Sequence, residues 1–174
     1  MQAIYAWYCT SDEPGQTFEI NLGEFGEQIR RHESQKGDKG DSSLLVKLFY
    51  ETIERRDEFD GLIQSKAENW ELERIALLDR ILMQMGICEM LEFPEIPIKV
   101  SINEYLEIAK KFSTPKSSKF INGILDSLYL EFKEKERIQK KGRGLIEESL
   151  PKKNGPPRGG GGRGGGFNRG GGGY

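Results

Sequence analysis

The 174-residue chain is poor in the residues that build metal sites and disulfide frameworks. It contains two cysteines, Cys9 and Cys88, and a single histidine, His32. A zinc site needs about four Cys or His ligands at short spacings, and these three residues cannot supply them. We therefore expect no metal and no cofactor. We also expect both thiols to be free and buried, as suits a reducing compartment.

Long apolar runs are missing as well. No run approaches the roughly 20 residues needed to cross a bilayer, and the first residues lack the basic and apolar regions of a signal peptide. Hydrophobic residues make up 36% of the chain and charged residues 31%, so a core is possible beneath a heavily charged surface. These features predict a soluble cytoplasmic protein with no membrane partner.

Alternation of apolar and polar residues over strand length is scarce, with residues 95–100 as the one candidate. Helical spacing is common instead, and it predicts an all-α fold. The segment 71–91 is apolar nearly all round, which is typical of a buried central helix. The other predicted elements are the end of a helix over residues 1–9, helices over 18–29, 44–53 and 59–63, a short helix over 102–112 and a last helix from Thr114 to Phe132.

Local signals predict how three of these helices begin. Residues 41–43 follow a polar loop over 33–43 and offer N-caps. Ser101 and Glu104 have the spacing of a capping box, and Pro115 suits the first position of the last helix. At the other end of the chain, a packed helix that starts at Met1 without a cap suggests that a natural N-terminal turn is missing.

Composition divides the chain into three parts. Apolar residues concentrate in residues 1–133, which we predict to form one helical domain. Residues 134–154 form a charged extension or linker, and residues 155–174 form a disordered Gly/Arg-rich tail that can build no core. The whole chain carries a net charge of −2, although the tail holds three arginines and no acid. The rest is therefore more acidic still, and RNA binding there would need a local basic patch or a basic partner.

Such a patch is predicted at the head of the last helix. At about 100° per residue, five apolar side chains of residues 121–132 form a core stripe, and Phe120 falls about 90–100° from its centre. Lys116 and Lys119 lie further round, away from the core. A ring beside two ammonium groups can stack a base and meet phosphates, as single-stranded RNA requires. The alternative is that Phe120 borders the core and the lysines only confer solubility; Lys99 is a further candidate for the patch.

Two tandem patterns resemble the carboxy-terminal half of the NusB transcription antitermination family. One runs from Ile96-Pro97-Ile98-Lys99-Val100 to Asn103-Glu104, and the other is Lys119-Phe120-Ile121-Asn122-Gly123-Ile124-Leu125-Asp126. Asn69-Trp70 and Glu73-Arg74-Ile75 also match. The resemblance is strong over about residues 69–127, and the style of residues 104–117 resembles the Bacteroidetes branch.

The resemblance implies a fold of two small helical bundles packed together and a non-enzymatic function. Members bind boxA RNA of nascent ribosomal RNA together with the ribosomal protein NusE, within the RNA polymerase antitermination complex. It implies that Phe120 and Lys119 contact RNA and that Lys99 and Tyr5 lie on or near the RNA face. It also implies that Glu73 and Asp79 lie at the partner surface.

The tail carries RGG-like chemistry. Arg158, Arg163 and Arg169 stand among glycines, with Phe167 and Tyr174 as aromatics. Arginine can meet phosphate and stack on bases, so we predict weak RNA binding with little sequence preference. A plain solubilising linker is the alternative.

Two other functions stay open at this point. The arginine-rich opening segment usual in the family is absent, so the chain could bind NusE without appreciable RNA affinity of its own. A NusB-like domain also precedes some ribosomal-RNA methyltransferases. That enzyme would need a Gly-rich cofactor loop between a strand and a helix, which the glycines after residue 155 do not provide.

Overall fold

The computed structural model describes residues 1–10, 14, 40–67 and 70–145, and the regular elements within these ranges are all helical, which confirms the predicted fold class. The predicted helix over 18–29 and the tail lie outside the described residues. No helix in the described ranges is both long and apolar enough to span a bilayer. The elements are, in order, α1 (Gln2–Thr10), α3 (Gly40–Glu54), α4 (Arg56–Lys66), the 3-10 turn η1 (Leu72–Arg74), α5 (Leu77–Glu92), α6 (Ile98–Phe112), α7 (Ser117–Glu134) and the 3-10 turn η2 (Gly142–Leu145).

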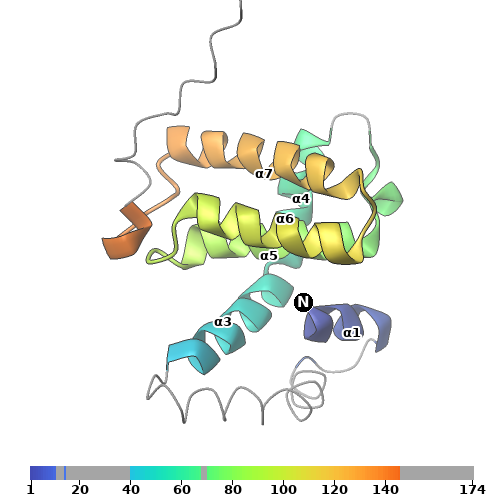
Figure 1. The fold of residues 1–174 in the computed structure, drawn as a ribbon, viewed down its shortest axis with the longest axis horizontal. Coiled ribbons are helices and arrows are strands. Elements are labelled where there is room, and N and C mark those ends of the chain that lie inside the picture. The colour runs from blue at the N-terminus through green and yellow to red at the C-terminus, as the bar shows by residue number, and fades with distance from the viewer. Residues whose placement is uncertain (11–13, 15–39, 68–69, 146–174) are drawn as a thin grey trace, which may run out of the picture.

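Helix α5 is the centre of the fold. It contacts α1, α3, α4, α6 and α7. Figure 1 shows α6 and α7 stacked above, with α1 and α3 forming a second group below them. This arrangement agrees with the predicted pair of small helical bundles packed together.

The central helix is buried nearly all round, as its composition predicts, from Ile81 to Met90. Its predicted start at residue 71 is wrong, because η1 and an extended Ala76 (ψ 134°) precede it. The Gln64 side chain donates to the carbonyl of Trp70 at 2.9 Å and accepts from the N–H of Leu72 at 2.9 Å. A side chain of α4 thus satisfies backbone groups that a longer α5 would have paired.

Helix α3 begins at Gly40, so the predicted N-caps at residues 41–43 lie inside the helix. Phe49 and Ile53 are buried as predicted, and the helix breaks before Arg56 as predicted. Leu44 and Leu45 belong to the same apolar stripe by helical spacing as Phe49 and Ile53, but each is 44% exposed. The stripe therefore contributes to the core only from about residue 48 onward.

The predicted starts of the last two helices are also wrong. Helix α6 begins at Ile98 with Pro97 as N-cap, because the fixed φ of proline (−63° here) suits a helix entry. Ser101 is therefore buried inside the helix, where its hydroxyl donates to Glu89 at 2.7 Å instead of capping. Helix α7 begins at Ser117, two residues after Pro115.

The two cysteines differ in environment, which corrects the expectation that both are buried. Cys9 is exposed and Cys88 is buried. Burial raises the pKa of the Cys88 thiol to about 12, so almost no thiolate forms at neutral pH. We expect iodoacetamide at pH 8 to alkylate Cys9 in the native protein and Cys88 only after unfolding, as mass spectrometry would report. Equal labelling of both thiols in the native state would contradict the packing around α5.

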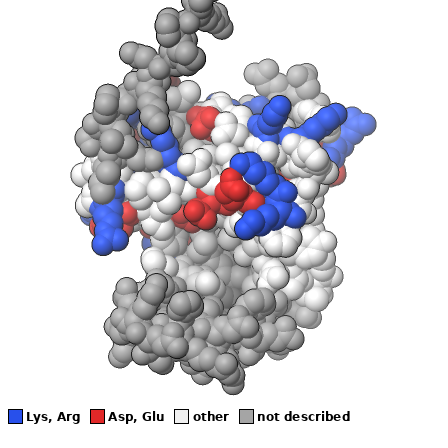
Figure 2. All heavy atoms as spheres, in the orientation of Figure 1, with Lys and Arg blue, Asp and Glu red and all other residues white. Residues whose placement is uncertain are grey.

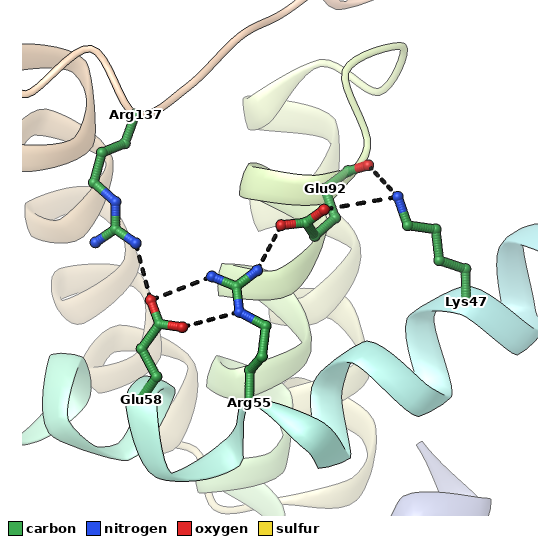
Figure 3. A network of polar contacts seen from close by, with 5 residues as sticks. All are labelled: Lys47, Arg55, Glu58, Glu92 and Arg137. Atoms are coloured by element: carbon green, nitrogen blue, oxygen red, sulfur yellow. Dashed lines mark hydrogen bonds and ion pairs between the residues drawn. The ribbon is translucent and has the colours of Figure 1, made fainter.

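A network of five charged side chains joins α3, α4, α5 and the segment after α7 (Figure 3). Arg55 donates to Glu58 at 2.9 Å and to Glu92 at 2.5 Å, and Lys47 lies 3.7 Å from Glu92. Arg137 donates to Glu58 at 2.9 Å. The hydrogen bonds from Arg55 and Arg137 lower the pKa of Glu58. Each of these solvent-accessible pairs contributes little stability alone. The Arg137–Glu58 bond joins the segment after α7 to α4.

Residues 135–145, predicted as part of a charged extension, fold back against the end of α5. The N–H of Lys141 donates to the carbonyl of Pro94 at 3.0 Å. Gly142 has a φ of +51°, which favours glycine, and a Cβ on Gly144 would collide with the Pro94 carbonyl. The two glycines therefore allow the close approach of these segments.

Candidate nucleic-acid interface

The turn between α6 and α7 is built around a buried carboxylate. Asp79, in the first turn of α5, accepts a hydrogen bond from the Ser113 hydroxyl at 2.5 Å. The Ser117 hydroxyl lies 2.9 Å from that of Ser113 and 2.8 Å from that of Thr114. These contacts tie the end of α6 and the start of α7 to the central helix. The turn therefore presents its outer side chains from a fixed backbone.

Four exposed lysines surround this turn. Lys110 and Lys111 end α6, where cations complement the helix dipole, and Lys116 and Lys119 begin α7. Lys110 lies 2.6 Å from Glu107, an exposed pair that screens it only in part. Figure 2 shows Lys and Arg side chains gathered toward this end of the molecule. The predicted local basic patch is thus present on an otherwise acidic chain.

The aromatic part of the patch differs from the prediction. The Phe120 ring is half-buried and packs against the core instead of standing free. Its ring centroid lies 6.2 Å from that of Trp70, with the planes tilted by 55°. Trp70 is 53% exposed. Trp70 is therefore the ring offered to solvent, with Phe120 behind it.

An open pocket lies beside the same turn. It is lined by Met1 and Tyr5 of α1, Leu78 of α5, and Phe112 and Thr114 at the turn, among others. Tyr5 is 45% exposed and Phe112 is 61% exposed. The fold thus brings Tyr5 next to the basic turn, although the two are more than a hundred residues apart in sequence.

Sequence reasoning missed Trp70 and Phe112 as surface rings. Phe112 follows the apolar spacing of Ile98, Ile102 and Tyr105, so a helical wheel places it in the core. It is exposed because the stripe continues to the last residue of α6, where little packs against it. The signal that could have found it is its position between Lys111 and a turn.

The other predicted residues are spread over the molecule. Lys99 lies in the first turn of α6, about 20 Å along the helix from Phe112, so it does not join the patch at Lys116. Glu73 is exposed in η1, whereas Asp79 is buried and used by the turn. Their roles at a partner surface stay predictions. Arg158, Arg163 and Arg169 lie outside the described residues.

This combination defines a class: an all-helical domain with exposed rings and lysines grouped at one turn, the surface chemistry that single-stranded nucleic acid requires. The chain belongs to the NusB family, whose family model matches residues 1–130.

Individual relatives agree with this assignment. The chain is 48% identical over 99 residues to the transcription antitermination protein NusB of Salinibacter ruber, covering 57% of this chain and 62% of that protein. It is 49% identical over 104 residues to the protein of the same name from Chloroherpeton thalassium, covering 60% and 49%. The chain thus spans about half to two thirds of these relatives. The solved structure of T. maritima NusB matches with a TM-score of 0.64 at 30% identity, covering 78% of this chain and 89% of that one.

Proposed function

We propose that this protein binds boxA-type single-stranded RNA of nascent ribosomal RNA together with NusE, and acts in transcription antitermination in the cytoplasm. The observation that carries the proposal is the fixed turn between α6 and α7. It combines the Trp70–Phe120 ring pair with exposed lysines. Family membership and the printed names of the relatives support it.

The geometry suggests how a strand would be held. One base stacks on the exposed face of Trp70, which Phe120 backs, and the flanking phosphates meet Lys116 and Lys119. A second base enters the pocket between Tyr5 and Phe112. In this proposal the protein recognises RNA and neither forms nor breaks a covalent bond. The arginines of the tail, residues 158, 163 and 169, would add sequence-independent contacts to phosphate.

The acidic charge of the chain favours a basic protein as a second ligand. Because three arginines lie in the tail, the rest of the chain is more acidic than the net charge of −2 indicates. Acids such as Glu73 are exposed on the domain. A basic ribosomal protein such as NusE fits that surface by charge. The same observation favours the second candidate function, in which the chain binds NusE and has no appreciable RNA affinity of its own.

Replacing Trp70 with alanine is expected to weaken boxA RNA binding by roughly 1–3 kcal/mol, since it removes one stacking surface. Phe120→Ala is expected to cause a loss within the same range, because Trp70 then lacks its support. Fluorescence anisotropy with labelled boxA RNA, with and without NusE, measures both. Leu130→Ala, at an exposed apolar residue of α7, is the control.

Two outcomes separate the candidates. If Trp70→Ala and Phe120→Ala bind RNA as tightly as the unchanged chain while circular dichroism shows the helices intact, the RNA face is elsewhere. If the unchanged chain binds RNA only when NusE is present, and both variants still assemble with NusE and RNA normally, the second candidate holds.

A further inference from the structure

A second pocket lies at the opposite end of the α6–α7 pair from the basic turn. Its apolar side chains are Ile98 from the start of α6, Tyr129 from α7, and Ile138 and Leu145 from the segment that folds back after α7. Tyr129 is half-buried and Leu145 is 48% exposed. The pocket therefore offers a ring face and aliphatic surface to a ligand of moderate size.

The charged residues that line this pocket are mostly basic. Lys133, Lys140 and Lys141 line it together with one acid, Glu136. Lys140 donates to the carbonyl of Phe93 at 2.8 Å, which holds its ammonium at the wall. On a chain with a net charge of −2, this local excess of positive charge favours an anionic ligand.

The walls are held in place by contacts already described. Arg137 is bonded to Glu58, the Lys141 N–H is bonded to Pro94, and Gly144 is buried against the same carbonyl. Most of the lining residues follow residue 130, where the family match ends. The pocket is therefore an addition to the family domain, built by the segment that precedes the Arg/Gly-rich residues 155–174.

We propose that this pocket binds a nucleotide of single-stranded RNA, as a second contact for a strand whose other part lies at the basic turn. A base packs on Tyr129 and Leu145, and its phosphates meet Lys133 and Lys141. RNA fits better than an acidic peptide because the pocket pairs a ring with lysines, as the first site does. The inference rests on the proposed function, since it extends the same RNA.

The helix geometry sets the path between the two sites. Tyr129 lies nine residues after Phe120, which is about 14 Å along α7 and roughly half a turn around it. A strand that reaches both must therefore cross the outer face of α7. Lys119 and Lys133 lie on that face, and exposed Asp126 lies between them. This acid opposes the crossing strand, so neutralising it should strengthen binding.

The test uses the full chain and two labelled RNAs, a short boxA RNA and the same RNA extended by about ten nucleotides. We expect Tyr129→Leu and Lys141→Gln each to weaken binding of the extended RNA about five-fold and to leave the short RNA unaffected. Lys141→Gln should also reduce the salt slope by about 0.7. Asp126→Asn should tighten binding of the extended RNA. Tyr50→Leu and Lys135→Gln are matched controls outside the pocket.

The outcomes separate this inference from the proposed function. Loss of short-RNA binding in Phe120→Ala, with the pocket variants normal on both RNAs, overturns the pocket and leaves the function standing. Normal RNA binding in Phe120→Ala and Trp70→Ala overturns the function itself. If an acidic peptide binds and Lys141→Gln abolishes that binding while the extended RNA is unaffected, the pocket serves a protein. If a chemical crosslink joins Lys141 to Lys152 or Lys153 and the crosslinked chain still binds the extended RNA normally, the chain's own segment occupies the pocket and the proposal is wrong.

Discussion

Replacing Arg80 with alanine is expected to lower the free energy of unfolding by about 3 kcal/mol, among the largest effects of any single change outside the apolar core. Arg80 of α5 donates to both carboxylate oxygens of Asp60 in α4, with its Nε at 2.8 Å. Asp60 is buried, and its other partner is Gln84 at 2.7 Å. Removing the guanidinium leaves a buried carboxylate without its counter-charge.

The same network reaches the helix that lines the pocket beside the basic turn. The Gln84 side chain hydrogen-bonds the Tyr8 hydroxyl at 3.1 Å, and the Arg80 guanidinium lies 5.6 Å from the Tyr8 ring centre. Tyr8 is in α1, the helix that carries Tyr5 to the pocket beside the basic turn. Loss of Arg80 should therefore loosen α1 as well as weaken the fold.

Urea unfolding followed by circular dichroism measures the effect of Arg80→Ala. Arg74→Ala, at an exposed arginine of η1, is the control and should stay within about 0.5 kcal/mol of the unchanged chain. The double change Arg80→Met with Asp60→Leu should recover much of the loss, because no unpaired charge remains. If Arg80→Ala unfolds at the same urea concentration as the control, the ion pair does not stabilise the fold.

How far sequence could predict the fold follows from which signals are local. The core stripe of α7 could be placed, and Ile121, Leu125 and Phe132 are buried as predicted. Hydrophobic periodicity can locate such a stripe because the stripe depends only on residues within one helix. The start of α5 depends on a contact from elsewhere, the Gln64 side chain of α4. The starts of α6 and α7 were misplaced because Ser101 and Ser117 bond to Glu89 and Ser113 inside the fold.

The candidate site shows the same division. The lysines at the head of α7 could be predicted, since their direction follows from the wheel of that helix. Trp70 and Phe112 could not, because their exposure depends on where other helices end. Asp79 was assigned to a partner surface through family resemblance, yet it is buried under the turn that it supports. The position of an acid in the sequence does not tell whether its carboxylate faces solvent.

Changing Gly86 to leucine is expected to destabilise the protein by roughly 3 kcal/mol. Gly86 lies in α5 and faces side chains of both α6 and α7: a Cβ there would lie 3.1 Å from Leu125 Cδ1 and 3.4 Å from Tyr105 Cδ2. Leucine adds three more carbons to a site that barely admits one, so the helices must separate or shift. Thermal and urea unfolding would report the loss.

Gly123 provides the matched comparison, because the same substitution there has room. It lies in α7, is exposed, and a Cβ would meet nothing within 4 Å. Both changes gain helix propensity, worth about 0.5–1 kcal/mol, so Gly123→Leu should stabilise the fold by that amount. The opposite signs of the two stability changes then separate the effect of packing from that of helix propensity. If the two variants moved stability in the same direction, the close contact between α5 and α7 at Gly86 could not be what sets their spacing.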